Sequence, residues 1–414
     1  MNDTFAAARE ASRYLLSIDD ALRSKVIFTL AGLIEENMAG LLEANARDLA
    51  MMDSANPLYD RLQLTPDRLK AIASDLRHVA TLPCPVGEEV EHRSLPNDID
   101  LRRVRVPFGV IGVIYEARPN VTFDVFSLCL KSGNACILKG GRDADASNRA
   151  AITLIHLALR ENGLPESVAT LLPSTHEATS ALLNAVGYVD VVIPRGGRNL
   201  IDFVRKNAQV PVIETGAGVV HVYFDRDANA SMGRDIIANA KTRRVSVCNA
   251  LDTLLIHRQR LAQLPDILAP LAAKNVELHA DADAYKVLTE GGYPAQLLKK
   301  ADDTCWDREW MDYKMGVRTV DSIDDAINHI ACHGSGHSES IVTDNNEAAE
   351  MFQSMVDASC VYVNLPTSFT DGGQFGLGAE IGISTQKLGP RGPMGLREIT
   401  TTRYLLSGNG QLRP

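Results

Sequence analysis

The chain has 414 residues, which is too long for a single hydrophobic core and predicts two or three domains. Its 45% hydrophobic and 23% charged residues are typical of a globular protein. A net charge of −10 and an aromatic content of only 5% argue against nucleic-acid binding and against an aromatic platform for sugars.

The cysteines and the amino terminus exclude further classes of protein. Seven cysteines are scattered along the chain, and no pair has the CxxC spacing of a structural zinc site. Cys332, His333 and His337 lie close together, but no further ligands have compatible spacing, so we expect no bound metal. The amino terminus lacks an apolar signal core, and no window approaches the roughly 18 apolar residues that span a bilayer. We therefore expect a cytoplasmic protein without a membrane segment.

Residues 4–80 show apolar side chains at helical spacing and predict a layer of helices without chemistry of its own. Asp19 or Asp20 is expected to cap one helix, and Thr65 before Pro66 another. Residues 91–106 then alternate around a Pro-Asn-Asp turn and predict a β-hairpin. Such a hairpin either pairs with another subunit or forms an edge of its own domain, and the pattern alone leaves both open.

Between residues 108 and 257, short apolar runs alternate with helical segments. The expected strands are 109–115, 135–139, 168–172, 189–193, 210–213, 219–224 and 251–256, and the expected helices are 121–130, 146–160, 176–184, 199–206 and 230–241. Continuous apolar strands alternating with helices predict parallel sheets covered on both faces. Ligands of such sheets bind beyond the carboxyl ends of the strands. The carboxyl-terminal third adds expected helices at 258–273 and 321–332 and strands at 361–364 and 400–406.

Cys248 is the first candidate for chemistry. It follows three cations, Lys241, Arg243 and Arg244, and nearby positive charge favours the nucleophilic thiolate form of a cysteine. The alternative is a small buried hydrophobic side chain, which is the usual role of a free cysteine.

Two glycine turns and one asparagine follow expected strands. Lys139 with Gly140, and Arg195 with Gly196 and Gly197, place a cation and bare backbone where a phosphate or ribose could lie. Neither turn is a GxGxxG motif, so both can also be simple turns.

Asn120 stands at the end of the first strong strand of the apolar region. Its side-chain amide is suited to stabilise an oxyanion, and the alternative role for it is a helix N-cap.

Five longer strings, at 113–122, 138–141, 192–197, 247–257 and 375–396, together resemble the aldehyde dehydrogenase superfamily. Within it they resemble the phosphorylating enzymes that act on glutamate 5-semialdehyde in proline biosynthesis. The last two strings are long and specific, and all five occur in order along nearly the whole chain.

The resemblance implies an α/β fold with two Rossmann-like parallel-sheet domains and a small β element for oligomerisation, hence a homo-oligomer. The implied divisions are 1–91, 107–216 and 374–399 for the NADP-binding domain, 217–373 for the catalytic domain, and 92–106 with 400–414 for oligomerisation.

The same resemblance implies the reaction, which is NADPH-dependent reduction of L-glutamyl 5-phosphate to L-glutamate 5-semialdehyde. A thioester on the cysteine is the implied intermediate, phosphate is released, and no metal takes part. Lys139 and Arg142 favour a 2′-phosphate only mildly, so the residues alone leave both NADPH and NADH open. The sequence shows no kinase-like extension, so we expect the acyl phosphate to come from a separate glutamate kinase through transient contact.

Residue roles are likewise carried over from the family. Cys248 is the implied nucleophile, and Asn120 with the Cys248 N–H is the implied oxyanion hole. The implied cofactor-binding residues are Lys139, Gly140, Arg195, Gly196 and Gly197. The candidates for holding the substrate phosphate and carboxylate are Arg118, Arg244 and Arg391.

Two rival functions remain at this point. One is a hydrolytic aldehyde dehydrogenase with Glu214 as the base that activates water, a role that acyl-phosphate reduction does not need. The other is an inactive nucleotide-binding homologue. The sequence also departs from the family pattern at Val245, Asp252 and Ser368, where proline, glutamate and arginine are usual, and at Leu365-Pro366. The changes at 365, 366 and 368 bear on recognition of the substrate carboxylate.

Overall fold

A computed structural model describes residues 1–54, 56 and 59–413, which form two compact units. The first unit comprises Met1–Thr215, Gly376–Gly382 and Leu388–Pro414, and the second comprises Gly216–Phe375 and Ile383–Lys387. The domain divisions expected from the sequence include residues 55, 57, 58 and 414, which lie outside the described residues.

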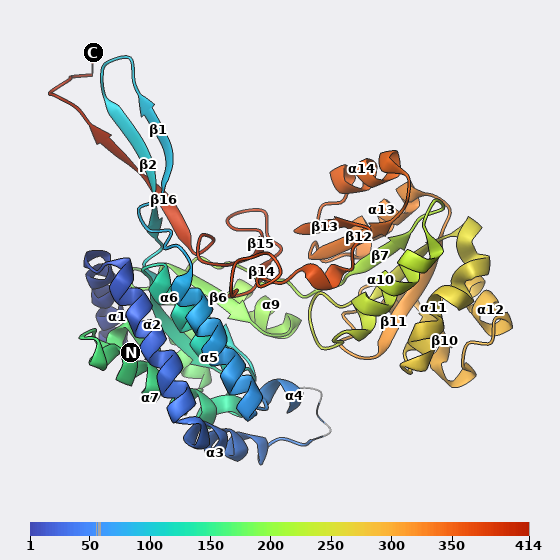
Figure 1. The fold of residues 1–414 in the computed structure, drawn as a ribbon, viewed down its shortest axis with the longest axis horizontal. Helices are drawn as coiled ribbons and strands as arrows, with labels where there is room; N and C mark the ends of the chain where they lie inside the picture. Colours follow the sequence, from blue (N-terminus) through green and yellow to red (C-terminus); the bar gives the residue numbers. More distant parts are fainter. Residues whose placement is uncertain (55, 57–58, 414) are drawn as a thin grey trace. The chain divides into compact units, whose positions relative to one another are not determined.

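Helices of the first unit surround a small sheet (Figure 1). The α-helices are α1 (Asn2–Tyr14), α2 (Asp20–Glu36), α3 (Met38–Leu49), α4 (Tyr59–Leu62), α5 (Pro66–Thr81), α6 (Asn120–Lys131), α7 (Asp145–Glu161), α8 (His176–Leu183) and α9 (Arg198–Asn207), and the 3₁₀ helices are η1 (Leu15–Ser17), η2 (Arg142–Ala144) and η3 (Glu166–Val168). The predicted caps are confirmed: the Asp19 carboxylate accepts the Leu22 N–H at 2.8 Å, and the Thr65 hydroxyl accepts the Arg68 N–H at 3.2 Å.

The sheet of the first unit is parallel, with strand order β5-β4-β3-β6. Its strands are β3 (Val110–Tyr115), β4 (Ala135–Gly140), β5 (Ala169–Leu171) and β6 (Val191–Arg195). All six residues of β3 are buried, as a continuous apolar run predicts. The predicted strand at 210–213 is wrong, because only Val212 forms a single bridge, with Val192. Pro211 has no N–H to donate, which prevents a continuous ladder at that position.

A three-stranded antiparallel sheet extends from the first unit, away from its helices (Figure 1). The predicted hairpin is confirmed as β1 (Glu89–Ser94) and β2 (Asp100–Pro107), and β16 (Thr400–Ser407) pairs along the other edge of β2. Few of its side chains are buried, among them Leu101 and Val104. The short strand β15 (Gly392–Pro393) also belongs to the first unit.

The second unit is built on a seven-stranded parallel sheet of order β10-β9-β11-β8-β7-β12-β13. The strands of this sheet are β7 (His221–Phe224), β8 (Thr253–His257), β9 (Glu277–Ala280), β10 (Leu298–Lys300), β11 (Lys314–Val320), β12 (Ser338–Val342) and β13 (Cys360–Val363). The short strand β14 (Ile383–Ser384) also belongs to this unit but not to the sheet. Its helices are α10 (Ala230–Thr242), α11 (Leu264–Ala273), α12 (Ala282–Glu290), α13 (Ile323–His333), α14 (Asn346–Met355), η4 (Arg258–Gln263), η5 (Ala295–Leu297), η6 (Asp303–Cys305) and η7 (Thr367–Phe369). Apolar clusters cover both faces of this sheet.

Candidate active site

Cys248 lies in a turn between α10 and β8, and its side chain is half-buried. The next residue anchors this turn: the Asn249 amide donates to the carbonyl oxygen of Thr370 at 2.9 Å. The Thr367 hydroxyl donates back to the Asn249 carbonyl oxygen at 2.8 Å. The turn is therefore fastened on its carboxyl side to the segment around η7. Such fastening holds a nucleophile in one orientation.

Gly218 approaches the backbone of the same turn so closely that only glycine fits. A β-carbon built on Gly218 would lie 1.6 Å from the Cys248 carbonyl oxygen. The Gly218 N–H donates to a carboxylate oxygen of Glu309 at 3.1 Å, which holds the glycine in place. No local sequence pattern indicates these contacts, because 30 or more positions separate Gly218 and Glu309 from Cys248.

Lys241 does not supply exposed positive charge near Cys248, which corrects the sequence-based interpretation of its role. Its side chain is fully buried, because it faces the interior of the unit from the last turn of α10. Burial lowers its pKa, and the neighbouring charge of Asp252 opposes that shift. Asp252 is buried too, and its carboxylate accepts the backbone N–H of Trp310 at 2.9 Å. Arg243 and Arg244 are the exposed cations of this region.

Ser368, where the family pattern has arginine, is 9% exposed. Its hydroxyl donates to the side-chain oxygen of Asn239 on α10 at 2.7 Å. The side chain thus stabilises the packing of η7 on α10, and this contact involves no charge that a carboxylate could use.

Asn120 is the first residue of α6, and it does not cap the helix. The N-cap position is Pro119, without a side-chain hydrogen bond, so the alternative role considered from the sequence is wrong. Instead, the Asn120 amide nitrogen donates to a carboxylate oxygen of Asp124, one turn later, at 2.9 Å. The amide is therefore oriented by a partner on its own helix.

Lys139 and Gly140 end strand β4 in the first unit. The Lys139 side chain is half-buried, and burial first and then the charge of Arg142 lower its pKa. A β-carbon on Gly140 would lie 2.2 Å from the Asn148 amide nitrogen, so glycine permits α7 to approach the strand closely.

Gly196 and Gly197 form the turn before α9, and a carboxylate of the same unit occupies it. The Gly197 N–H donates to Glu116 Oε2 at 3.0 Å, and a β-carbon on Gly196 would lie 2.6 Å from that oxygen. The amino-terminal end of α9 thus already holds an anionic group, which its dipole favours. Arg195 points elsewhere: its guanidinium lies near Gly382, and its charge lowers the pKa of Asp124.

The three candidate substrate arginines are distributed over both units. Arg118 is half-buried and Arg391 exposed in the first unit, and Arg244 is exposed in the second. Glu214, the base of the rival hydrolytic reaction, lies 3.9 Å from the Arg205 guanidinium, an ion pair within the first unit.

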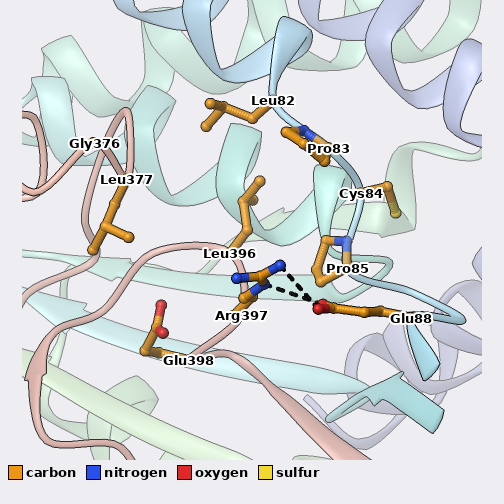
Figure 2. A pocket seen from close by; sticks show the side chains of 10 residues that line it. All are labelled: Leu82, Pro83, Cys84, Pro85, Glu88, Gly376, Leu377, Leu396, Arg397 and Glu398. Atoms are coloured by element: carbon orange, nitrogen blue, oxygen red, sulfur yellow. Dashed lines mark hydrogen bonds and ion pairs between the residues drawn. The ribbon is translucent and has the colours of Figure 1, made fainter. Parts of the chain in front are cut away.

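A cavity of about 370 Å³ lies at the base of the three-stranded sheet, and none of its lining residues is a predicted site residue (Figure 2). Leu82, Pro85 and Leu396 are among its apolar walls, and the Glu88–Arg397 ion pair lies across it.

The described part of the chain shows neither a metal centre nor a membrane-spanning helix. Within it, no group of three or more potential ligands is arranged to hold a metal ion. No helix there is both long and apolar enough to cross a bilayer.

Comparison with known proteins matches residues 1–286 to the aldehyde dehydrogenase family. The chain is 56% identical to the gamma-glutamyl phosphate reductase of Bacteroides thetaiotaomicron over 413 residues, covering 100% of this chain and 99% of the relative. The crystal structure of gamma-glutamyl phosphate reductase from Thermotoga maritima is 38% identical and superposes with a TM-score of 0.94, covering 100% of this chain and 99% of the other. An acetylating aldehyde dehydrogenase from Geobacillus thermoglucosidasius, 15% identical with a TM-score of 0.73 over 100% of this chain and 97% of the other, shares the fold. The predicted α/β fold is confirmed.

Proposed function

We propose, because this chain belongs to the aldehyde dehydrogenase family, that it reduces L-glutamyl 5-phosphate to L-glutamate 5-semialdehyde and releases phosphate. One observation carries this assignment: the chain matches gamma-glutamyl phosphate reductases over its full length, at 56% identity in sequence and with a TM-score of 0.94 in structure. The reaction is a step of proline biosynthesis.

The Cys248 thiolate attacks the acyl carbon of the substrate. A carbon–sulfur bond forms, the bond to the phosphate oxygen breaks, and phosphate leaves with the electron pair. NADPH, when bound, supplies a hydride to the thioester carbon. The resulting oxyanion collapses, the carbon–sulfur bond breaks, and the aldehyde leaves a free thiolate. The fastened turn around Cys248 supports this role because nucleophilic attack requires a fixed direction of approach.

Asn120 and the Cys248 N–H are the proposed donors to the oxyanion of both tetrahedral intermediates. Arg118, Arg244 and Arg391 are the proposed partners of the substrate phosphate and carboxylate, since guanidinium groups bind both in a bidentate manner. Glu214 has no proposed catalytic role, because reduction of the thioester by hydride needs no activated water.

The cofactor residues of the first unit fit a phosphorylated dinucleotide. Lys139 and Arg142 bring two cations together at the carboxyl end of β4, where a 2′-phosphate is the expected partner. The turn of Gly196 and Gly197 is the proposed place of the pyrophosphate. There Glu116 would have to release the Gly197 N–H, which it now accepts.

Replacing Lys139 with methionine is expected to raise the KM for NADPH about 10-fold and to change the KM for NADH much less. A charge-assisted contact with the 2′-phosphate contributes about 1.5 kcal/mol, and NADH has no such phosphate. Steady-state kinetics with both nucleotides measures the difference, with Lys70→Met on the exposed face of α5 as control. An equal loss for both nucleotides would assign Lys139 to another part of the cofactor.

We also propose that the chain is a cytoplasmic homo-oligomer assembled through the sheet of β1, β2 and β16. Tyr404 and Leu406 on β16 are 53% and 57% exposed, and the outer strands offer unpaired edges. A separate glutamate kinase is the proposed source of the unstable acyl phosphate, delivered through transient contact.

The reverse reaction tests the proposed function. With glutamate 5-semialdehyde and NADP⁺, reduction of the nucleotide is expected to require inorganic phosphate and to saturate with it. Turnover that is independent of phosphate would instead establish the hydrolytic reaction.

A further inference from the structure

Asp124 and Asn120 form a pair on one face of α6. They are four residues apart, so their side chains lie one above the other, and the amide nitrogen donates to the carboxylate at 2.9 Å. The amide has two hydrogens on this nitrogen, and the contact with Asp124 uses one of them. The plane of the amide then fixes the direction of the second hydrogen and places the amide oxygen on the opposite side.

The ionised carboxylate decides which way the amide is turned. A side-chain amide can rotate by half a turn with almost no change in shape, which exchanges its nitrogen and oxygen. An ionised carboxylate only accepts hydrogen bonds, so it selects the nitrogen. A protonated carboxyl group can also donate to the amide oxygen, and it therefore permits the turned amide. The turned amide would present an acceptor, rather than a donor, to an oxyanion.

The surroundings of Asp124 place its ionisation in the neutral range. Burial is the largest cause that raises its pKa, the charges of Asp75 from α5 and Glu380 act in the same direction, and the net value is about 7. The hydrogen bond from Asn120 and the charge of Arg195, at the end of β6, act in the opposite direction. Arg195, which the sequence suggested for the cofactor, thus also supports the charged form of this carboxyl group.

We propose that Asp124 is a positioning residue whose carboxylate holds the Asn120 amide in the sense required for oxyanion stabilisation. The inference rests on the proposed function, because it presupposes that Asn120 donates to the oxyanion. Asp124 itself acts through Asn120 and needs no contact with the substrate. Ionised Asp124 destabilises the fold, because this half-buried carboxylate loses hydration and lies near other carboxyl groups.

The consequence for stability has a definite sign. The pKa of Asp124 in the folded chain is raised above its usual value of 3.8, so the folded state holds the proton more tightly than the unfolded state. Stability therefore falls as the pH rises from about 4 to about 7, where the carboxyl group ionises in the fold. Asp124→Asn removes this loss. Relative to the wild type, the variant is expected to gain Tm between pH 5 and pH 8.

The test combines kcat and Tm across pH 5.5 to pH 9, with saturating substrates. The wild-type kcat is expected to rise with pH along a limb centred near pH 7. In Asp124→Asn this limb is expected to be absent, and kcat at pH 8 is expected to be about 10-fold below that of the wild type. Its KM values should change little, because ground-state binding does not use the oxyanion. A folding defect predicts a lower Tm, whereas the positioning role predicts a slower yet more stable enzyme at pH 8.

Asp145→Asn is the matched control, because Asp145 forms a four-residue pair with Arg149 at the start of α7, on the surface. It should retain the wild-type kcat and the limb near pH 7. A second control is alkylation of Cys248 by iodoacetamide, whose pH dependence should be the same in wild type and Asp124→Asn.

Wild-type kcat in Asp124→Asn, or an unchanged limb near pH 7, would overturn the positioning role while leaving the reaction established. Wild-type enzyme without phosphate-dependent activity would instead overturn the proposed function, and the positioning role with it.

Discussion

Replacing Cys248 with alanine is expected to lower kcat for reduction of the acyl phosphate by at least about 1,000-fold, because the thioester cannot form without the sulfur. Binding of NADPH should remain, since the proposed cofactor residues lie in the first unit and Cys248 lies in the second. The loss of activity is measured from the absorbance change as NADPH is oxidised, and the Kd for NADPH is measured from nucleotide fluorescence.

Cys332→Ser is the control for this prediction, because Cys332 is an exposed thiol on α13. It should keep wild-type activity and remain sensitive to iodoacetamide. If Cys248→Ala kept more than a tenth of the wild-type turnover, the cysteine would have no place in the mechanism.

Gly218→Ala is expected to lower kcat about 100-fold, although residue 218 carries no reacting group. The added methyl carbon would lie 1.6 Å from the Cys248 carbonyl oxygen, so the backbone of one of the two segments must move. A displacement of about 1 Å at a nucleophile is enough for a loss of this size. The strain should also lower the free energy of unfolding by about 1–3 kcal/mol, which urea denaturation measures.

The matched control is Gly40→Ala, because a β-carbon on Gly40 meets no atom within 4 Å and the residue lies within helix α3. This change should raise stability by about 1 kcal/mol through helix propensity and leave kcat unchanged. Wild-type kcat in Gly218→Ala would show that the turn adjusts without displacing the sulfur.

Local patterns in the sequence were sufficient to predict most of the elements. The hairpin and the strands of the parallel sheets follow from alternating or continuous apolar runs, and Asp19 and Thr65 cap their helices as their residue types predict. The strand predicted at 210–213 failed because apolar composition masked Pro211, whose missing N–H limits pairing to a single bridge.

Contacts around the candidate site could be predicted only where the partners lie close together in the sequence. The sequence does not reveal that Lys241 points into the core, because this depends on how α10 packs on its sheet. Glu116 lies 81 positions from Gly197, so the sequence carried no signal for their contact. Asp124 did have a signal, since a carboxylate four residues after Asn120 on an expected helix lies on the same face.

The most direct test of the covalent mechanism is the release of phosphate from L-glutamyl 5-phosphate without any nicotinamide present. Rapid-quench measurement should show a burst of about one phosphate per chain, accompanied by a glutamyl adduct on Cys248 in the intact mass. Cys248→Ala provides the background from spontaneous breakdown of the substrate. A wild-type burst equal to that background, with no adduct on the sulfur, would contradict thioester formation at Cys248.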